Sequence, residues 1–192
     1  MLVTPENHRR NRNHALSLAG VMAVTSAVAS WVFPPLLFSL TLCPFIYWLV
    51  RRRCLRRLRI MRQAFPPSWE QVLQSHIAFF RALPGQEKER FRQLVNVFLD
   101  EVRITGIRTE VDDTVRVLVA ASAAIPIFGF QDWEYHRLGE VLVYPDSFGE
   151  KYQTTGNADE NILGMVGLKH LSGVMILSKP SLLEAYFPHP SI

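Results

Sequence analysis

The sequence VRVLVAASAA, residues 115–124, consists almost entirely of valine, leucine and alanine, and Arg116 is its only charged residue. Asp112-Asp113-Thr114 stands directly before it, and these residue types favour helix N-termini. We therefore predict a helix from Val115 to about Ala124. Because a helix that is apolar on most sides must be covered on most sides, this segment predicts the centre of a hydrophobic core.

Two further helices are predicted on the N-terminal side of this core helix. Ser68-Trp69-Glu70-Gln71 has the form of a capping box, and apolar residues follow it at helical spacing as far as Pro84-Gly85. An unbroken i, i+3, i+4, i+7 apolar stripe then runs from Phe91 to Val102, and Gly106 is expected to end that helix. Both stripes are expected to face the core.

Strands are predicted on the C-terminal side of the core helix. Gly139–Tyr144 (GEVLVY) and Gly173–Ser178 (GVMILS) are short apolar runs, each followed closely by a proline. Residues 149–167 between them are rich in loop-forming residues, and Ser181–Phe187 is long enough for one or two helical turns. Because helices come mainly first and strands mainly last, the predicted class is α+β.

A different kind of segment precedes this domain, since residues 15–50 contain no charged side chain across 36 positions. That run exceeds the roughly 18 apolar residues that indicate a membrane span. A single straight helix of this length would measure about 54 Å, against a hydrocarbon core of about 30 Å. Pro34-Pro35 near its middle favours two short helices joined by a bend. The sequence therefore predicts a transmembrane hairpin.

Arginine clusters flank this segment on both sides. Residues 1–62 hold ten arginines against Glu6 alone, a net charge of +9, whereas residues 63–192 hold eleven basic and sixteen acidic residues, a net charge of −5. Positive flanks are typical of the cytoplasmic side, so the expected location is the inner membrane, with the N-terminus and the domain in the cytoplasm. The lipid bilayer is then a partner, and the acidic domain argues against a nucleic-acid partner.

Two points remain open at this stage. The arginine run 51–62 either sets the orientation of the hairpin or binds anionic headgroups or, less favoured, nucleic acid. Ala27-Val28-Ala29 also resembles a signal-peptide cleavage site, after which only residues 30–50 would stay apolar. Cys43 and Cys54 are the only cysteines, so residues 63–192 have no disulfide, which suits a reducing compartment.

The predicted organisation has four regions along the chain. They are a basic N-terminus at residues 1–14, the hairpin at 15–50, an arginine-rich linker at 51–67 and the α+β domain at 68–192.

No catalytic centre can be assembled from short motifs. The six histidines, at positions 8, 14, 76, 136, 170 and 189, include no pair four residues apart, so no H-x-x-x-H zinc pair exists. Nucleophile-elbow, phosphate-loop and dinucleotide motifs are absent. Asp132/Glu134 and Asp159/Glu160 are interpreted as solvated carboxylates. We predict no catalytic, cofactor-binding or metal-binding residue in this chain.

Five segments nevertheless resemble, in order and spacing, the N-terminal half of the Mlc titration factor A-like zinc peptidases, over about residues 70–187. These segments are Phe91–Leu99 (FRQLVNVFL), Arg103–Val111 (RITGIRTEV), Arg116–Phe130 (RVLVAASAAIPIFGF), Glu140–Phe148 (EVLVYPDSF) and Gly173–Ser178 (GVMILS). Val-Tyr-Pro followed by Ser-Phe is the most specific element. The resemblance implies a zincin-like metallopeptidase fold, and one branch of the family is similar in carrying an N-terminal membrane segment.

The resemblance also implies where the chemistry of the family lies. In members of the family, a helix with H-E-x-x-H follows the segments similar to GVMILS and 179–187; its two histidines hold zinc and its glutamate activates water. This sequence ends YFPHPSI, so no catalytic or metal position is transferred, and His189 is not interpreted as a ligand. The expected cofactor is none in this chain and zinc in the full-length family.

Three readings of function follow. The favoured one is a membrane-anchored family member that stops before the H-E-x-x-H helix and is inactive alone; without the catalytic helices, its core helix would lack part of its cover. The alternative is a non-catalytic membrane-bound module for a protein or peptide partner, with Gly173–Ser178 as the edge strand that pairs with the peptide. The third is a small membrane protein of other function. The predicted fold is an N-terminal transmembrane helical hairpin followed by the N-terminal part of a zincin-like domain.

Overall fold

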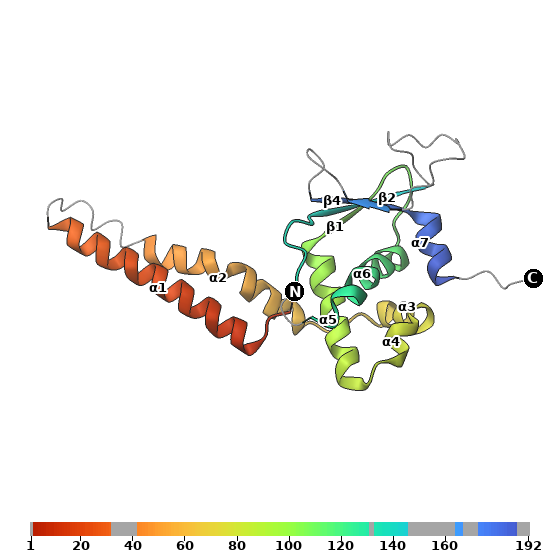
Figure 1. Cartoon of the computed structure of the whole chain (residues 1–192), viewed down its shortest axis with the longest axis horizontal. Coiled ribbons are helices and arrows are strands. Elements are labelled where there is room, and N and C mark those ends of the chain that lie inside the picture. Colours follow the sequence, from red (N-terminus) through yellow and green to blue (C-terminus); the bar gives the residue numbers. More distant parts are fainter. Residues whose placement is uncertain (1, 32–41, 131–132, 146–163, 167–172, 188–192) are drawn as a thin grey trace, which may run out of the picture. The chain divides into compact units, whose positions relative to one another are not determined.

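The structure is a computed structural model that describes residues 2–31, 42–130, 133–145, 164–166 and 173–187 (Figure 1). The chain divides into two compact units, residues 2–63 and residues 64–192, and each is described by itself.

The first unit is a pair of helices, α1 (Pro5–Ser30) and α2 (Leu42–Met61), which lie side by side (Figure 1). Contacts of His8 fix their register, because its Nε2 lies 3.3 Å from a terminal nitrogen of Arg51 and its Nδ1 lies 3.7 Å from Sγ of Cys54. The start of α1 therefore lies beside the second half of α2, and the pair is antiparallel.

The predicted transmembrane hairpin is wrong, since no helix within the described residues is long and apolar enough to cross a membrane. The reason lies in the helix boundaries. The first turns of α1 contain arginines and the second half of α2 is mostly arginine, so the stretches without arginine, acidic residues or histidine are residues 15–30 and 42–50. At 1.5 Å per residue these parts measure about 24 Å and about 14 Å, less than a hydrocarbon core of about 30 Å. The predicted bend at Pro34-Pro35 lies outside the described residues.

The second unit opens with three helices, α3 (Pro67–His76), α4 (Ala78–Ala82) and α5 (Gly85–Glu101). The helix predicted to follow Ser68 is thus two helices, because Ile77 has an extended backbone (φ −101°, ψ 96°) between them. The predicted capping box is not formed either. Pro66 is the N-cap residue, it makes no side-chain capping bond, and a proline occupies the first turn, where a missing N–H costs nothing.

A small sheet follows, with strand order β1-β2-β4-β3. β1 (Arg103–Gly106), β2 (Glu140–Tyr144) and β4 (Val174–Ser178) are parallel neighbours, and β3 (Gly164–Val166) pairs antiparallel with β4. The two predicted strands correspond to β2 and β4, whereas β1 and β3 were not predicted. The described fold is mostly helical with a small, mainly parallel sheet, and this corrects the predicted class of an α+β domain behind a membrane hairpin.

The helix α6 (Asp113–Ile127) connects β1 to β2 and forms the centre of the core. Asp112 caps it by accepting a hydrogen bond from Val115 N at 2.8 Å, so the predicted cap is confirmed. Val117, Leu118 and Ala121 have no exposed surface. They are covered because α6 packs against α3, α5 and the last helix, α7 (Lys179–Tyr186). The expectation that this helix lacks part of its cover is therefore wrong.

Gly106 ends β1 rather than a helix. A Cβ atom there would collide with the carbonyl oxygen of Thr109, and Arg108 in the same turn has a positive φ of 58°. This tight turn redirects the chain from the edge of the sheet toward the start of α6, and only glycine leaves room for it.

Candidate functional site

The passage from β4 into α7 is fixed by hydrogen bonds of a buried serine. Ser178, the last residue of β4, is 1% exposed, and its hydroxyl oxygen accepts from the backbone N of Ser181 at 3.4 Å and from the Ser181 hydroxyl at 3.1 Å. The buried hydroxyl therefore caps α7, and Pro180 lies in the first turn, where its fixed φ suits a helix. These residues fix the direction in which the chain leaves the sheet.

Both ends of α7 are held by polar contacts. Lys179 Nζ donates to the carbonyl oxygen of Glu110 at 2.7 Å, which ties the start of α7 to the loop before α6. The hydroxyls of Tyr186 and Ser122 lie 2.8 Å apart, and Ser122 donates to the carbonyl oxygen of Leu118 within α6. The ring of Phe187 packs against that of His76, with centroids 4.0 Å apart and planes tilted by 41°. α7 is therefore joined to α3, α6 and the loop before α6.

The strand order changes which strand can receive a peptide. Gly173–Ser178 was predicted as an edge strand, yet β4 lies between β2 and β3 and pairs with both. The outer strand on that side is β3, with Gly164, Met165 and Val166 opposite Leu177, Ile176 and Met175. Among the strands that the structure describes, β3 therefore lies at the edge of the sheet and β4 does not.

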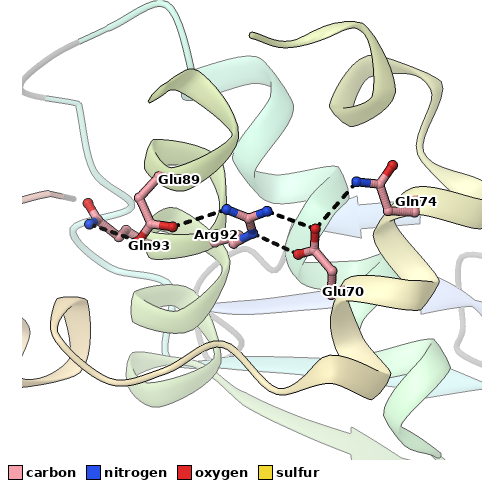
Figure 2. Close-up of polar contacts among 5 residues, drawn as sticks. All are labelled: Glu70, Gln74, Glu89, Arg92 and Gln93. Atoms are coloured by element: carbon pink, nitrogen blue, oxygen red, sulfur yellow. Dashed lines mark hydrogen bonds and ion pairs between the residues drawn. The ribbon is translucent and has the colours of Figure 1, made fainter. Parts of the chain in front are cut away.

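A cluster of charged and amide side chains lies elsewhere, between α3 and α5 (Figure 2). Arg92 forms two parallel contacts with Glu70, Nε to Oε2 at 2.7 Å and a terminal nitrogen to Oε1 at 2.8 Å, and reaches Glu89 at 3.1 Å. Gln74 donates to Glu70 and Gln93 donates to Glu89. These five residues connect the two helices by a bidentate pair, which is the stronger type of ion pair.

This cluster is unsuited to acid–base catalysis. The hydrogen bond from Arg92 lowers the pKa of Glu70, and the same bond raises the pKa of Arg92. A carboxylate whose pKa is lowered is a weaker base, and both of its oxygens already accept hydrogen bonds. We interpret the cluster as a connection between helices. The cluster was not predicted from the sequence, because Glu70 was assigned to a capping box.

The histidines are spread over the chain. His76 ends α3, and Nδ1 of the 75% exposed His136 lies 3.0 Å from Glu134, whereas His8 belongs to the first unit. His170 and His189, together with Asp132, Asp159 and Glu160, lie outside the described residues. Within the part of the chain that the structure describes, no three His, Cys, Asp or Glu side chains are grouped so that they could hold a metal ion. The described residues therefore do not fit a zinc site.

Comparisons with known proteins place the chain in a family. Residues 50–190 match the model of a family described as glucose-regulated metallo-peptidase M90. An uncharacterized protein of the cyanobacterium Synechocystis is 29% identical over 94 residues, which is 48% of this chain and 34% of that protein. No solved structure matches. The chain thus spans about a third of the length of the curated relative.

The match covers about three quarters of the chain and includes all five segments that carry the resemblance to the Mlc titration factor A-like peptidases. That resemblance is confirmed at the level of the family, whose full-length members are metallopeptidases, which implies zinc in them. On this evidence the chain belongs to the glucose-regulated metallo-peptidase M90 family.

Proposed function

We propose that these 192 residues supply the non-catalytic part of a zinc metallopeptidase of the M90 family and do not hydrolyse peptide bonds by themselves. One observation carries the proposal: the chain matches the family over residues 50–190, yet its sequence contains no H-E-x-x-H. The two imidazoles and the general base that this motif supplies are therefore missing from these 192 residues.

The contacts of α7 favour a role for this part of the protein in positioning other elements. Ser178 and Lys179 fix where α7 starts, and Tyr186 fixes its end against α6. A sheet and helix held this firmly are suited to position whatever follows them, because catalytic groups must be held within fractions of an ångström by rigid elements.

The test is a measurement of bound zinc and of peptide hydrolysis by the purified 192-residue chain, with added zinc and with a chelator. We expect less than one zinc per ten chains and no hydrolysis that the chelator abolishes, since zinc hydrolases need three protein ligands and a base. Stoichiometric zinc together with chelator-sensitive hydrolysis would show that the proposal is wrong.

A second candidate function is peptide binding without cleavage, and the position of β3 favours it. The outer strand of the sheet is antiparallel to its neighbour β4, and an extended peptide can add to such an edge through main-chain hydrogen bonds. Titration of the chain with a pool of fluorescent extended peptides would test this. Saturable binding supports it, and no saturable binding up to millimolar concentration counts against it.

A further inference from the structure

The helix pair of residues 2–63 separates charge from apolar surface along its length. His8 lies beside Arg51 and Cys54, so the arginines of α1 and those of α2 gather at one end of the pair. Seven of them are exposed: Arg9, Arg10, Arg12, Arg52, Arg53, Arg56 and Arg59. Glu6 is the only acidic residue among residues 1–62. This end of the pair is therefore strongly positive.

The other end is apolar and exposed. In α1 the exposed fraction is 63% for Val24 and 68% for Val28, and Trp31 just beyond α1 is 94% exposed. In α2 the exposed residues include Phe45 at 55% and Trp48 at 53%. Large apolar side chains exposed together are uncommon on a protein surface that faces only water, so this end indicates an interaction surface.

The distribution of these side chains around α1 indicates the kind of partner. Leu16, Leu18, Val21, Val24 and Val28 are all exposed. At about 100° per residue they spread over roughly 200° of the helix circumference. A second protein surface would cover one face of the helix, whereas a fluid apolar medium covers every side. The wide spread therefore favours lipid over a second copy of the chain.

We propose that the α1–α2 pair docks on the surface of an anionic lipid bilayer. Its apolar end enters one leaflet, and its arginines contact the headgroup phosphates of the same leaflet. The uncharged part of α1, about 24 Å long, enters the hydrocarbon region without crossing it, because the region is about 30 Å thick. The positive end matches negatively charged headgroups, and exposed arginines near a membrane surface each strengthen such binding.

The residues between the apolar part and the arginine-rich part of α2 fit this placement. Tyr47 and Trp48 lie one turn before Arg51, and the guanidinium of Arg51 donates to the Tyr47 hydroxyl at 2.5 Å. Tyrosine and tryptophan are enriched at the level of the headgroups, where one end of the ring is apolar and the other is hydrated. The transition from apolar to arginine-rich sequence therefore coincides with aromatic residues suited to the interface. A nucleic-acid partner would leave these aromatic and aliphatic side chains without a role.

The first experiment measures co-sedimentation of the full chain with vesicles of phosphatidylglycerol and phosphatidylcholine, and with phosphatidylcholine alone. We expect binding to the anionic vesicles that weakens with salt, and a loss of roughly fivefold in the partition coefficient for each of Arg52→Gln and Arg59→Gln. The matched control is Arg103→Gln, which removes a charge that is also exposed, but in β1, and should leave binding unchanged. Equal binding to both vesicle types, or equal losses in all three variants, overturns the proposal.

The second experiment places the apolar end directly. In the variant W48F/W69F/W133F, Trp31 is the only tryptophan, and we expect its emission to shift to the blue and to be quenched by brominated lipid chains when tryptophan is excited selectively. A red-shifted Trp31 in sedimented vesicles overturns the proposal. So does a blue shift without lipid that follows a concentration-dependent rise in mass, because the occupant is then a second copy. Binding of a DNA duplex as tight as vesicle binding at equal salt also overturns it.

Discussion

Arg92 shows that a contact between two helices can determine the role of a residue for which the local sequence predicts a different role. Its guanidinium donates to both carboxylate oxygens of Glu70 in α3 and to one of Glu89 in α5. Glu70 has the spacing of a capping-box residue, yet its carboxylate binds an arginine 22 residues away. The pair is about a quarter exposed, and water therefore weakens it. The contribution of the pair to stability is expected to be modest and to depend on pH.

At this scale we predict the pH dependence of the Glu70→Gln variant. The pKa of Glu70 is lowered in the folded chain from an ordinary value of 4.5, so its contribution is complete above about pH 4.5 and disappears as the pH falls through the folded pKa. The variant should unfold about 1 kcal/mol more easily than wild type at pH 7 and equally easily once Glu70 is protonated. Urea unfolding at pH 7, 5 and 3 measures the difference.

The control for this series is Glu184→Gln, which changes an exposed glutamate of α7. It should stay within about 0.5 kcal/mol of wild type at each pH. If the Glu70→Gln difference persisted unchanged at low pH, the ion pair would not be its cause.

At the scale of elements, α7 is the helix whose attachment matters most for the proposed function. It contributes no fully buried residue, so its position depends on the hydroxyl contact of Tyr186 with Ser122 and on the Ser178 cap. Hydroxyl pairs between elements are suited to position a helix because they are directional, whereas apolar contacts are not.

We therefore predict coupling between Tyr186→Phe and Ser122→Ala. Each single change should lower the free energy of unfolding by about 1 kcal/mol, and the double change should cost about the same as Ser122→Ala alone, because both single changes remove the hydrogen bond between Tyr186 and Ser122. Hydrogen exchange of α7 amides should accelerate in all three variants. Additive single costs would mean that the two hydroxyls act independently.

At the scale of the whole molecule, the described residues of the second unit enclose a core of their own. Phe80, Phe91 and Leu118 are fully buried, and α6 is covered by α3, α5 and α7. Each of these side chains is surrounded within the chain, so removing part of one leaves a cavity that the neighbours fill only partly.

Truncation of the core tests this arrangement. Leu118→Ala should lower the free energy of unfolding by about 2–5 kcal/mol, since Leu118 has no exposed surface. Leu55→Ala, which truncates a leucine that is 40% exposed, is the matched control and should change it by less than about 1 kcal/mol. Urea unfolding followed by near-ultraviolet circular dichroism compares the two. Equal effects would mean that α6 is not enclosed as described.

The sequence by itself determined the family, the core helix and its Asp112 cap, the strands β2 and β4, and the helix α7. These features rest on local patterns, such as apolar periodicity and capping residues, which act within a few residues. The absence of H-E-x-x-H is likewise a property of the sequence alone.

Only the tertiary structure decided the rest. β1 has four residues and β3 has three, too few for a readable alternation, and they become strands because partners from distant parts of the chain supply their hydrogen bonds. The Glu70–Arg92 pair and the burial of α6 also depend on residues that are distant in the sequence. The length of the uncharged run 15–50 predicted a membrane hairpin. The helix boundaries divide this run between α1 and α2, and neither helix is long and apolar enough to cross a membrane.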